Sequence, residues 1–112
     1  MWQDNETLVD IVRAGRRILL FTEKMSAEEF AADLKTQAAV QHQLLVLGEA
    51  AKRVSEPFRA QHPEIPWSPM SRMRDKLIHA YDLVNLDEVW RTATEDIPAL
   101  LAQLEPLLSD SP

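Results

Sequence analysis

Apolar residues recur every three or four positions along almost the whole chain, which is the spacing of amphipathic helices. The first helix is predicted to begin near Asp4 or Asn5, since either side chain can cap a helix, and to end near Lys24. Its apolar face consists of Leu8, Ile11, Val12, Gly15, Ile18, Leu19 and Thr22. Gly15 lowers helix stability, so we interpret it as a close approach of another helix, with an incidental glycine as the alternative. The pattern indicates an all-α fold.

A short helix follows, for which Ser26 and Glu29 fit a capping box. In such a box the serine side chain accepts a hydrogen bond from the backbone N–H of the glutamate, and the glutamate side chain accepts one from the backbone N–H of the serine. Phe30 and Leu34 are expected to anchor this helix to the core.

The longest helix is predicted from about residue 35 to residue 54. Its apolar stripe consists of Val40, Leu44, Leu47, Ala51 and Val54. Further apolar residues flank this stripe, so the helix should lie at the centre of the bundle. Gly48 lies at the edge of the stripe, where a neighbouring backbone could come close. Glu49 has two interpretations. It either faces an interior or interface with a cationic partner, or forms an exposed pair with Lys52 or Arg53.

Four of the seven prolines lie between residues 57 and 69 and should break the helical pattern into a short turn of helix and a loop. Trp67 is expected to pack on the core, Ser68 to cap the next helix and Pro69 to occupy its first position. That helix should run to about Tyr81.

A last helix should be capped by Asn85 or Asp87. Its inner face consists of Leu86, Val89, Trp90, Ala93, Ile97, Leu100, Leu101, Leu104 and Leu108. Pro98 should kink this helix or split it in two, and residues 109–112 should be frayed.

Composition narrows the class of protein. The 112 residues, 46% hydrophobic, are expected to form a single domain, 1–112, whose modest core an oligomer would enlarge. The net charge of −6 argues against sequence-specific DNA binding, which needs many phosphate contacts, but allows a local basic pocket.

The chain has no cysteine, so thiolate metal sites and cysteine nucleophiles are excluded. It has no membrane-spanning apolar run and an acidic start, so we expect a cytoplasmic protein.

Arg74, His79 and Tyr81 form the pattern Arg-x-x-x-x-His-x-Tyr. An arginine offers a charged fork for phosphate, a histidine exchanges protons near neutral pH, and a tyrosine presents a hydroxyl, so the trio predicts phosphodiester chemistry. On a straight helix, His79 is rotated from Arg74 by about 140°. The helix must therefore loosen near His79, the arginine must wrap around, or a second copy of the chain must complete the site.

The motif follows two other segments, Leu47-Gly-Glu-Ala-Ala-Lys52 and Pro63-Glu-Ile-Pro-Trp67. In this order the three resemble the HEPN superfamily, and most closely HepT, the toxin-like half of bacterial HepT and MNT (minimal nucleotidyltransferase) modules. The resemblance extends from the first predicted helix to the last. Two positions depart from it, because Asp75 stands where Asn is more frequent and Ala80 stands where Gly is common.

This resemblance implies an up-and-down bundle of four to five main helices, forming a homodimer with the motif at or beside the subunit interface. It also implies the toxin of a type VII-like toxin–antitoxin module, a ribonuclease in which Arg74 and His79 are catalytic and Asp75 and Glu49 are supporting residues. A partner nucleotidyltransferase would transfer AMP from ATP to Tyr81 and so add a negative phosphate beside the site. Neither a metal nor a cofactor is expected.

If the site cleaves RNA without a metal, His79 would act as general base on a ribose 2′-hydroxyl and Arg74 would stabilise charge on the phosphate. The product would carry a cyclic phosphate. His42 and His62 are not obviously placed as a general acid, and we interpret both as ordinary structural or surface residues. In a dimer, the partner's His79 could supply the acid.

The residue types alone also fit a structural interpretation. In it, Arg74 pairs with Glu49 or Asp75. His79 is then an interior residue, and Tyr81 closes the helix against the core. The corresponding function is a non-catalytic helical module that dimerises or binds a nucleotidyltransferase. Alanine at His79 separates the two, since it should abolish growth inhibition by a ribonuclease toxin but change only assembly, or nothing, in a binding module.

Overall fold

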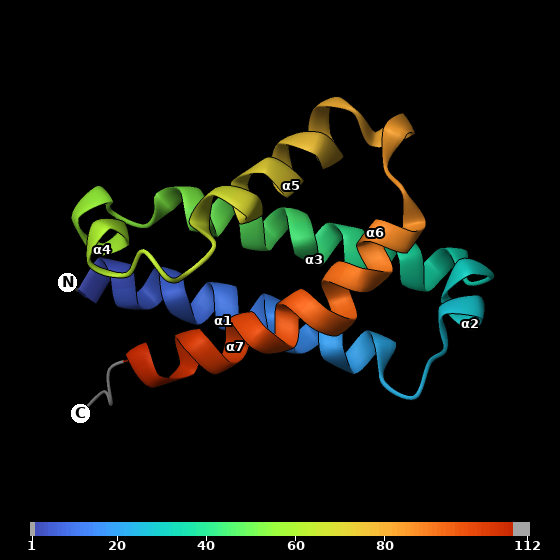
Figure 1. The fold of residues 1–112 in the computed structure, drawn as a ribbon, viewed down its shortest axis with the longest axis horizontal. Helices are drawn as coiled ribbons and strands as arrows, with labels where there is room; N and C mark the ends of the chain where they lie inside the picture. The colour runs from blue at the N-terminus through green and yellow to red at the C-terminus, as the bar shows by residue number, and fades with distance from the viewer. Residues whose placement is uncertain (1, 109–112) are drawn as a thin grey trace.

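The structure, a computed structural model, describes residues 2–108, apart from the side chain of Trp2. Its long helices alternate in direction (Figure 1). They are α1 (Trp2–Thr22), α3 (Leu34–Arg53), α5 (Trp67–His79) and a last rod of α6 (Leu86–Arg91), the π-helical η2 (Thr92–Asp96) and α7 (Ile97–Leu104). The short elements are α2 (Ala27–Ala31), α4 (Glu56–Gln61) and the 3-10 turns η1 (Tyr81–Leu83) and η3 (Glu105–Leu107). The predicted all-α, up-and-down bundle is confirmed.

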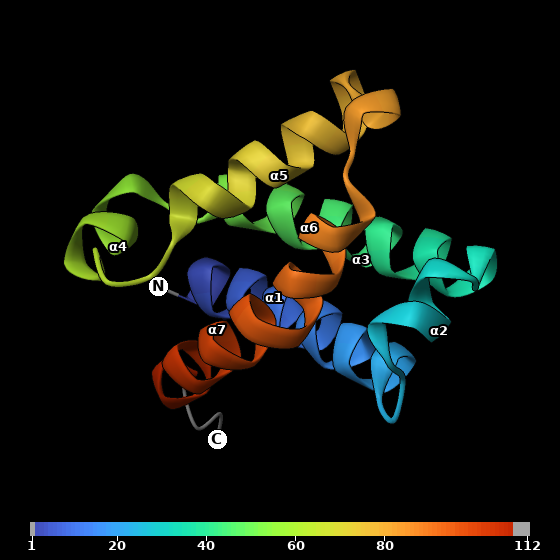
Figure 2. The ribbon, with the colours of Figure 1, turned by 45° about the vertical axis from the view of Figure 1, so that its right-hand side comes forward.

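The longest apolar helix, α3, lies at the centre of the bundle, as its sequence predicts. It packs against α1 and α5, while α7 packs on α1 (Figure 2). The largest fully buried side chains come from helices throughout the chain and are Phe30, Leu8, Ile11, Ile18, Leu104, Val40, Val54 and Val89. Burying one such side chain contributes about 1.5–3 kcal/mol, so this shared interior holds the helices together.

Both glycines lie where two helices approach closely, as predicted. A Cβ atom on Gly15 would come within 2.9 Å of Leu101 Cδ2 on α7. One on Gly48 would come within 2.6 Å of the carbonyl oxygen of Met70 on α5 and would also collide with the Cβ atom of Arg74. Gly48 therefore determines how closely α5 crosses α3.

The start of α1 differs from the prediction. The helix begins at Trp2, so Asp4 lies inside its first turn and does not cap it. Asp4 is only 4% exposed, and its carboxylate accepts hydrogen bonds from Ser55 N at 2.9 Å and Ser55 Oγ at 2.7 Å. Ser55 is the N-cap of α4, so Asp4 links α1 to the junction between α3 and α4. These hydrogen bonds hold the pKa of Asp4 below its ordinary value of 3.8.

Replacing Asp4 with alanine should lower the free energy of unfolding at neutral pH by about 1–3 kcal/mol, because the half-buried donors of Ser55 lose a charged acceptor. A lowered pKa means that this stabilisation is present above the ordinary value of 3.8 and is lost as the pH falls through the lower folded value. Urea unfolding at neutral and acid pH measures it. Asp10→Ala, an exposed aspartate on the same helix, is the control, and equal losses for the two variants would contradict the prediction.

Most of the capping and anchoring residues predicted at the helix ends have the predicted role. The capping box of Ser26 and Glu29 is present, with both hydrogen bonds formed. Asn85 caps α6. Phe30 is buried, but Leu34 is 79% exposed, so its predicted role as a core anchor is wrong. Leu34 is the first residue of α3, where its side chain faces solvent beyond the end of the core.

The start of α5 also differs slightly from the prediction. The helix begins at Trp67 with Pro66 in the N-cap position, so Ser68 does not cap it and Pro69 is its third residue. A proline within the first turn is tolerated because its missing N–H would have no partner inside the helix. Trp67 is buried, as predicted.

The last helix is irregular just before Pro98, where the sequence predicts a kink or a split, but its backbone stays helical throughout. Ahead of Pro98 the backbone widens into η2, where the N–H of Ile97 donates to the carbonyl of Thr92, five residues back. The proline ring crowds the carbonyl four residues before it, and the wider π-helical turn accommodates that crowding. The tail at 109–112, predicted to be frayed, lies outside the described residues.

The outer faces of the helices are polar. On α1, for example, Arg13 and Arg16 are exposed and form ion pairs with Asp10 and Glu105. Across residues 2–108, no helix combines the length and the apolar character that crossing a membrane requires.

Candidate functional site

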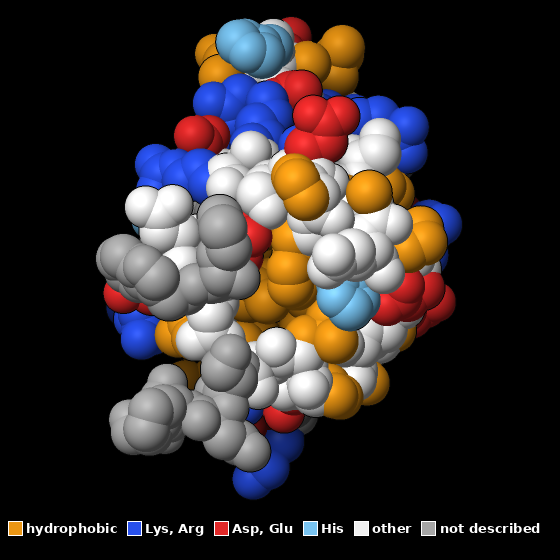
Figure 3. All heavy atoms as spheres, turned by 90° about the vertical axis from the view of Figure 1, so that its left-hand side faces the viewer, with side chains coloured by type: hydrophobic (Ala, Val, Ile, Leu, Met, Phe, Trp, Pro, Cys, Tyr) orange, Lys and Arg blue, Asp and Glu red, His pale blue; other side chains and the backbone are white. Residues whose placement is uncertain are grey.

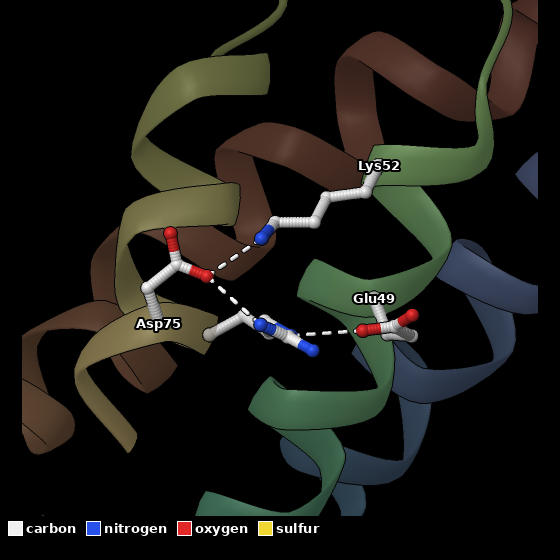
Figure 4. Close-up of polar contacts among 4 residues, drawn as sticks. Glu49, Lys52 and Asp75 are labelled. Carbon is white, nitrogen blue, oxygen red and sulfur yellow. Dashed lines mark hydrogen bonds and ion pairs between the residues drawn. The ribbon is translucent and has the colours of Figure 1, made fainter. Parts of the chain in front are cut away.

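Four charged side chains meet where α5 crosses α3 beside Gly48 (Figure 4). Arg74 donates from Nε to Glu49 Oε2 at 2.8 Å and from Nη1 to Asp75 Oδ1 at 3.0 Å. Lys52 Nζ donates to the same Asp75 oxygen at 2.6 Å. We call these four residues, Glu49, Lys52, Arg74 and Asp75, the ion-pair network.

The hydrogen bonds of the network stabilise its charged forms. Lys52 and then Arg74 lower the pKa of the Asp75 carboxyl, and Asp75 and Glu49 raise the pKa of the Arg74 guanidinium. The partner of Glu49 is therefore Arg74 on another helix, and not Lys52 or Arg53 on its own helix. Of the two interpretations of Glu49, the pair with Lys52 or Arg53 is wrong, and the cationic partner of the other is found, although the Glu49 side chain is 39% exposed and does not face the interior.

His79 and Tyr81 lie at the exposed end of α5. His79 is the last residue of the helix and is exposed, and Tyr81, the first residue of η1, is 75% exposed. The structural interpretation of the motif is wrong for both, since neither is an interior residue. It is right for Arg74, which pairs with both Glu49 and Asp75.

The motif residues do not form one cluster within this chain. Arg74 reaches toward α3, whereas His79 follows Asp75 by one helical turn, so Asp75 and His79 share a face of α5. The helix ends at His79, where the sequence predicts that it could loosen. Ala80 has φ −143° and ψ 41°, outside the left-handed region that favours glycine, so alanine is accommodated there. Tyr81 then belongs to a separate turn.

A groove of about 810 Å³ runs between α5 and the last helical rod. Apolar residues from α3, α5 and α7 line it: Leu44, Leu47, Met70, Met73, Ile97 and Leu100. Charged residues line it as well, and Lys76 pairs with Glu88 at 3.0 Å. A different face, the end of the molecule that carries α4, also shows hydrophobic side chains recessed among polar and charged ones (Figure 3). Asp75 belongs both to the groove and to the ion-pair network, so the groove borders the candidate site.

The other histidines lie in ordinary structural surroundings. His42 is exposed on α3. His62 stacks on Phe58, with 4.6 Å between ring centroids, and its Nδ1 lies 3.4 Å from Glu64 Oε2. Among the residues that the structure describes, no group of three or more His, Cys, Asp or Glu side chains could hold a metal ion.

Lys52 is the site residue that sequence reasoning missed. The sequence suggests it only as a neighbour of Glu49, whereas its partner is Asp75, 23 residues further along the chain. Gly48 is the signal that could have found it. Gly48 lies against α5, and Lys52, one turn further along α3, is on the same face, so Lys52 lies near the charged residues of α5.

Comparisons with known proteins identify the family of the chain. A sequence model of the family described as "Ribonuclease HepT-like" matches residues 11–107. A Thermococcus cleftensis protein named "Probable ribonuclease HepT" is 48% identical over 100 residues, which cover 89% of this chain and 91% of that protein. A Methanocaldococcus jannaschii protein named as a "Putative RNase" is 39% identical over 103 residues, covering 92% of this chain and 85% of that protein. No solved structure gives a significant match. The chain therefore belongs to the HepT-like ribonuclease family.

Proposed function

We propose that the chain is a metal-independent endoribonuclease that acts on cytoplasmic RNA as the toxin of a type VII-like toxin–antitoxin module. The observation that carries the proposal is His79, an exposed imidazole one turn beyond the ion pair of Arg74 and Asp75. Membership of the HepT-like ribonuclease family supports RNA as the substrate.

In the proposed reaction, His79 removes the proton of a ribose 2′-hydroxyl, and the 2′-oxygen attacks the adjacent phosphorus. The bond from phosphorus to the 5′-oxygen breaks, and that oxygen takes up a proton as it leaves. One product ends in a 2′,3′-cyclic phosphate and the other in a 5′-hydroxyl. Arg74 stabilises the charge on the phosphate, while Glu49 and Asp75 orient its guanidinium.

The proton for the leaving oxygen requires a second acid, which we assign to the partner's His79 in a homodimer. Two exposed hydrophobic side chains close to His79 in the sequence support an interface there. Ile78 is 38% exposed and Leu83 is 71% exposed. Such side chains lose unfavourable contact with water when a second copy covers them.

We propose that an MNT-type nucleotidyltransferase neutralises the toxin by transferring AMP to Tyr81. The exposure of Tyr81 supports this, because its hydroxyl is accessible to another enzyme. The attached phosphate would bring negative charge near Arg74 and His79, and thereby weaken RNA binding.

Expression in bacteria tests these proposals together. The chain alone should arrest growth and generate RNA ends with 2′,3′-cyclic phosphates. Co-expression with the nucleotidyltransferase should restore growth, and mass spectrometry should then find AMP on Tyr81 but not on a Tyr81→Phe variant. Normal growth with the soluble chain alone and unchanged RNA ends would overturn the ribonuclease proposal. Arrest relieved without AMP on Tyr81 would overturn only the proposed control.

A second candidate function is a non-catalytic module that dimerises or binds a nucleotidyltransferase. One observation favours it, which is that Glu49 and Asp75 already occupy the guanidinium of Arg74. Under this alternative, His79→Ala would leave growth unchanged and alter only assembly with the partner, as measured by size-exclusion chromatography.

A further inference from the structure

The ion-pair network places two cations on a single anionic oxygen. Asp75 Oδ1 accepts from Lys52 Nζ at 2.6 Å and from Arg74 Nη1 at 3.0 Å. The two cations come from different helices, α3 and α5, and Gly48 maintains the short distance between those helices. Asp75 Oδ1 thus has the same neighbours as a phosphate oxygen in a phosphate-binding site. In such sites arginine donates paired hydrogen bonds from its guanidinium and lysine contributes a compact positive charge.

The charges of the network balance in the free protein. Glu49 and Asp75 carry two negative charges, and Lys52 and Arg74 carry two positive charges. Glu49 bonds Nε of Arg74, which leaves the Nη1 side of the guanidinium directed at Asp75. If the carboxylate of Asp75 turns away, the other three residues have a net charge of +1, which matches one phosphodiester.

The position of Asp75 connects this oxygen to the proposed reaction. Asp75 and His79 are four residues apart on α5, so their side chains are neighbours on one face, with Cβ atoms about 5–6 Å apart. The side chains of Asp75 and Lys52 are 48% and 37% exposed, so a ligand from solvent can reach both. A phosphate that replaces the carboxylate would therefore lie within reach of His79.

We propose that Lys52 and Arg74 form a two-cation clamp for a phosphate of RNA, and that Asp75 occupies this clamp until RNA displaces it. This inference rests on the proposed function and adds Lys52 to it as a phosphate-binding residue. Asp75 thus orients Arg74 only in the free protein and competes there with the substrate, whereas Glu49 keeps its hydrogen bond to Nε of Arg74 when RNA is bound. Its carboxylate keeps the clamp neutral in the free protein, and its departure leaves the positive charge for RNA.

RNA binding by non-cleaving proteins tests the clamp. All variants carry His79→Ala, and fluorescence anisotropy measures the Kd of a labelled single-stranded RNA as a function of salt. Lys52→Gln should weaken binding about tenfold at low salt and reduce the slope of log Kd against log salt by about 0.7, the contribution of one phosphate contact. Lys35→Gln makes the same charge change at the other end of α3, where the side chain is exposed, and should leave both quantities close to those of the parent.

Asp75→Asn gives a second, independent readout. Removing the competing negative charge while keeping the size of the side chain should tighten RNA binding about tenfold. Circular dichroism checks that each variant remains helical. Equal Kd values and slopes for Lys52→Gln and Lys35→Gln, or weaker binding by Asp75→Asn, would overturn the clamp while RNA cleavage by the protein with His79 intact still supports the proposed function. A parent that binds no RNA, together with absent cleavage, would overturn both.

Discussion

His79→Ala should slow RNA cleavage by about a hundredfold to ten-thousandfold, the contribution usually made by a general acid or base. The same change should leave the fold intact, because His79 is exposed at the end of α5 and contributes nothing to the core. The measurement is the rate of cleavage of a labelled single-stranded RNA by the purified protein, with thermal unfolding followed in parallel.

His42→Ala is the matched control, since it removes an exposed histidine from α3 in the same protein. It should change neither the cleavage rate nor the unfolding temperature. If His79→Ala cleaves RNA at the rate of the unchanged protein, His79 is not the general base. A loss of cleavage that accompanies a large loss of stability would instead assign His79 a structural role.

Gly48→Ala should lower the free energy of unfolding by about 1–3 kcal/mol, the usual cost of forcing extra atoms into a packed interior. The added Cβ would lie 2.6 Å from the carbonyl oxygen of Met70 and would collide with the Cβ of Arg74. Both obstacles belong to the backbone or to the first side-chain atom, so neither can rotate away. Urea unfolding measures the loss.

Gly15→Ala provides the contrast. Its added Cβ would lie 2.9 Å from Leu101 Cδ2, the far end of a flexible side chain that can move. Alanine is also favoured over glycine within a helix by about 1 kcal/mol. The variant should therefore be close to neutral. If both variants lose the same stability, the crossing at Gly48 is not the special contact that we describe.

The effect of Gly48→Ala should extend to the site. The alanine would push α5 away from α3, and that movement would separate Arg74 from Glu49 and Lys52 from Asp75. We therefore expect slower RNA cleavage by the fraction of Gly48→Ala protein that remains folded, whereas Gly15→Ala should cleave RNA at the normal rate.

Much of the fold follows from short-range features of the sequence. The spacing of apolar residues locates the helices. The helix α3 has an apolar stripe with further apolar residues on either side, which identifies it as the central helix, because only the interior can cover so much apolar surface. The capping box at Ser26 and the irregularity before Pro98 depend on residues three to five positions apart. Such features form in the same way whatever the rest of the chain does.

The candidate site is only partly predictable in this way. The sequence locates Arg74, His79 and Tyr81 and suggests that Glu49 needs a cation, because residue type and spacing carry that information. It offers Arg74, Lys52 and Arg53 as candidates but does not choose among them, since the choice depends on where α5 crosses α3. Nor does it show that His79 and Tyr81 are exposed, because the helix period continues to Tyr81 whereas the helix itself ends at His79.

The sequence by itself thus determined the helices, their order and the residue types that we propose for phosphodiester chemistry, because these depend on local spacing and on side-chain type. Only the tertiary structure decided which charges meet. Asp4 bonds Ser55 across 51 residues and Lys52 bonds Asp75 across 23. Pairings of this kind depend on how closely and at what point two helices cross, and packing of the whole interior sets that geometry.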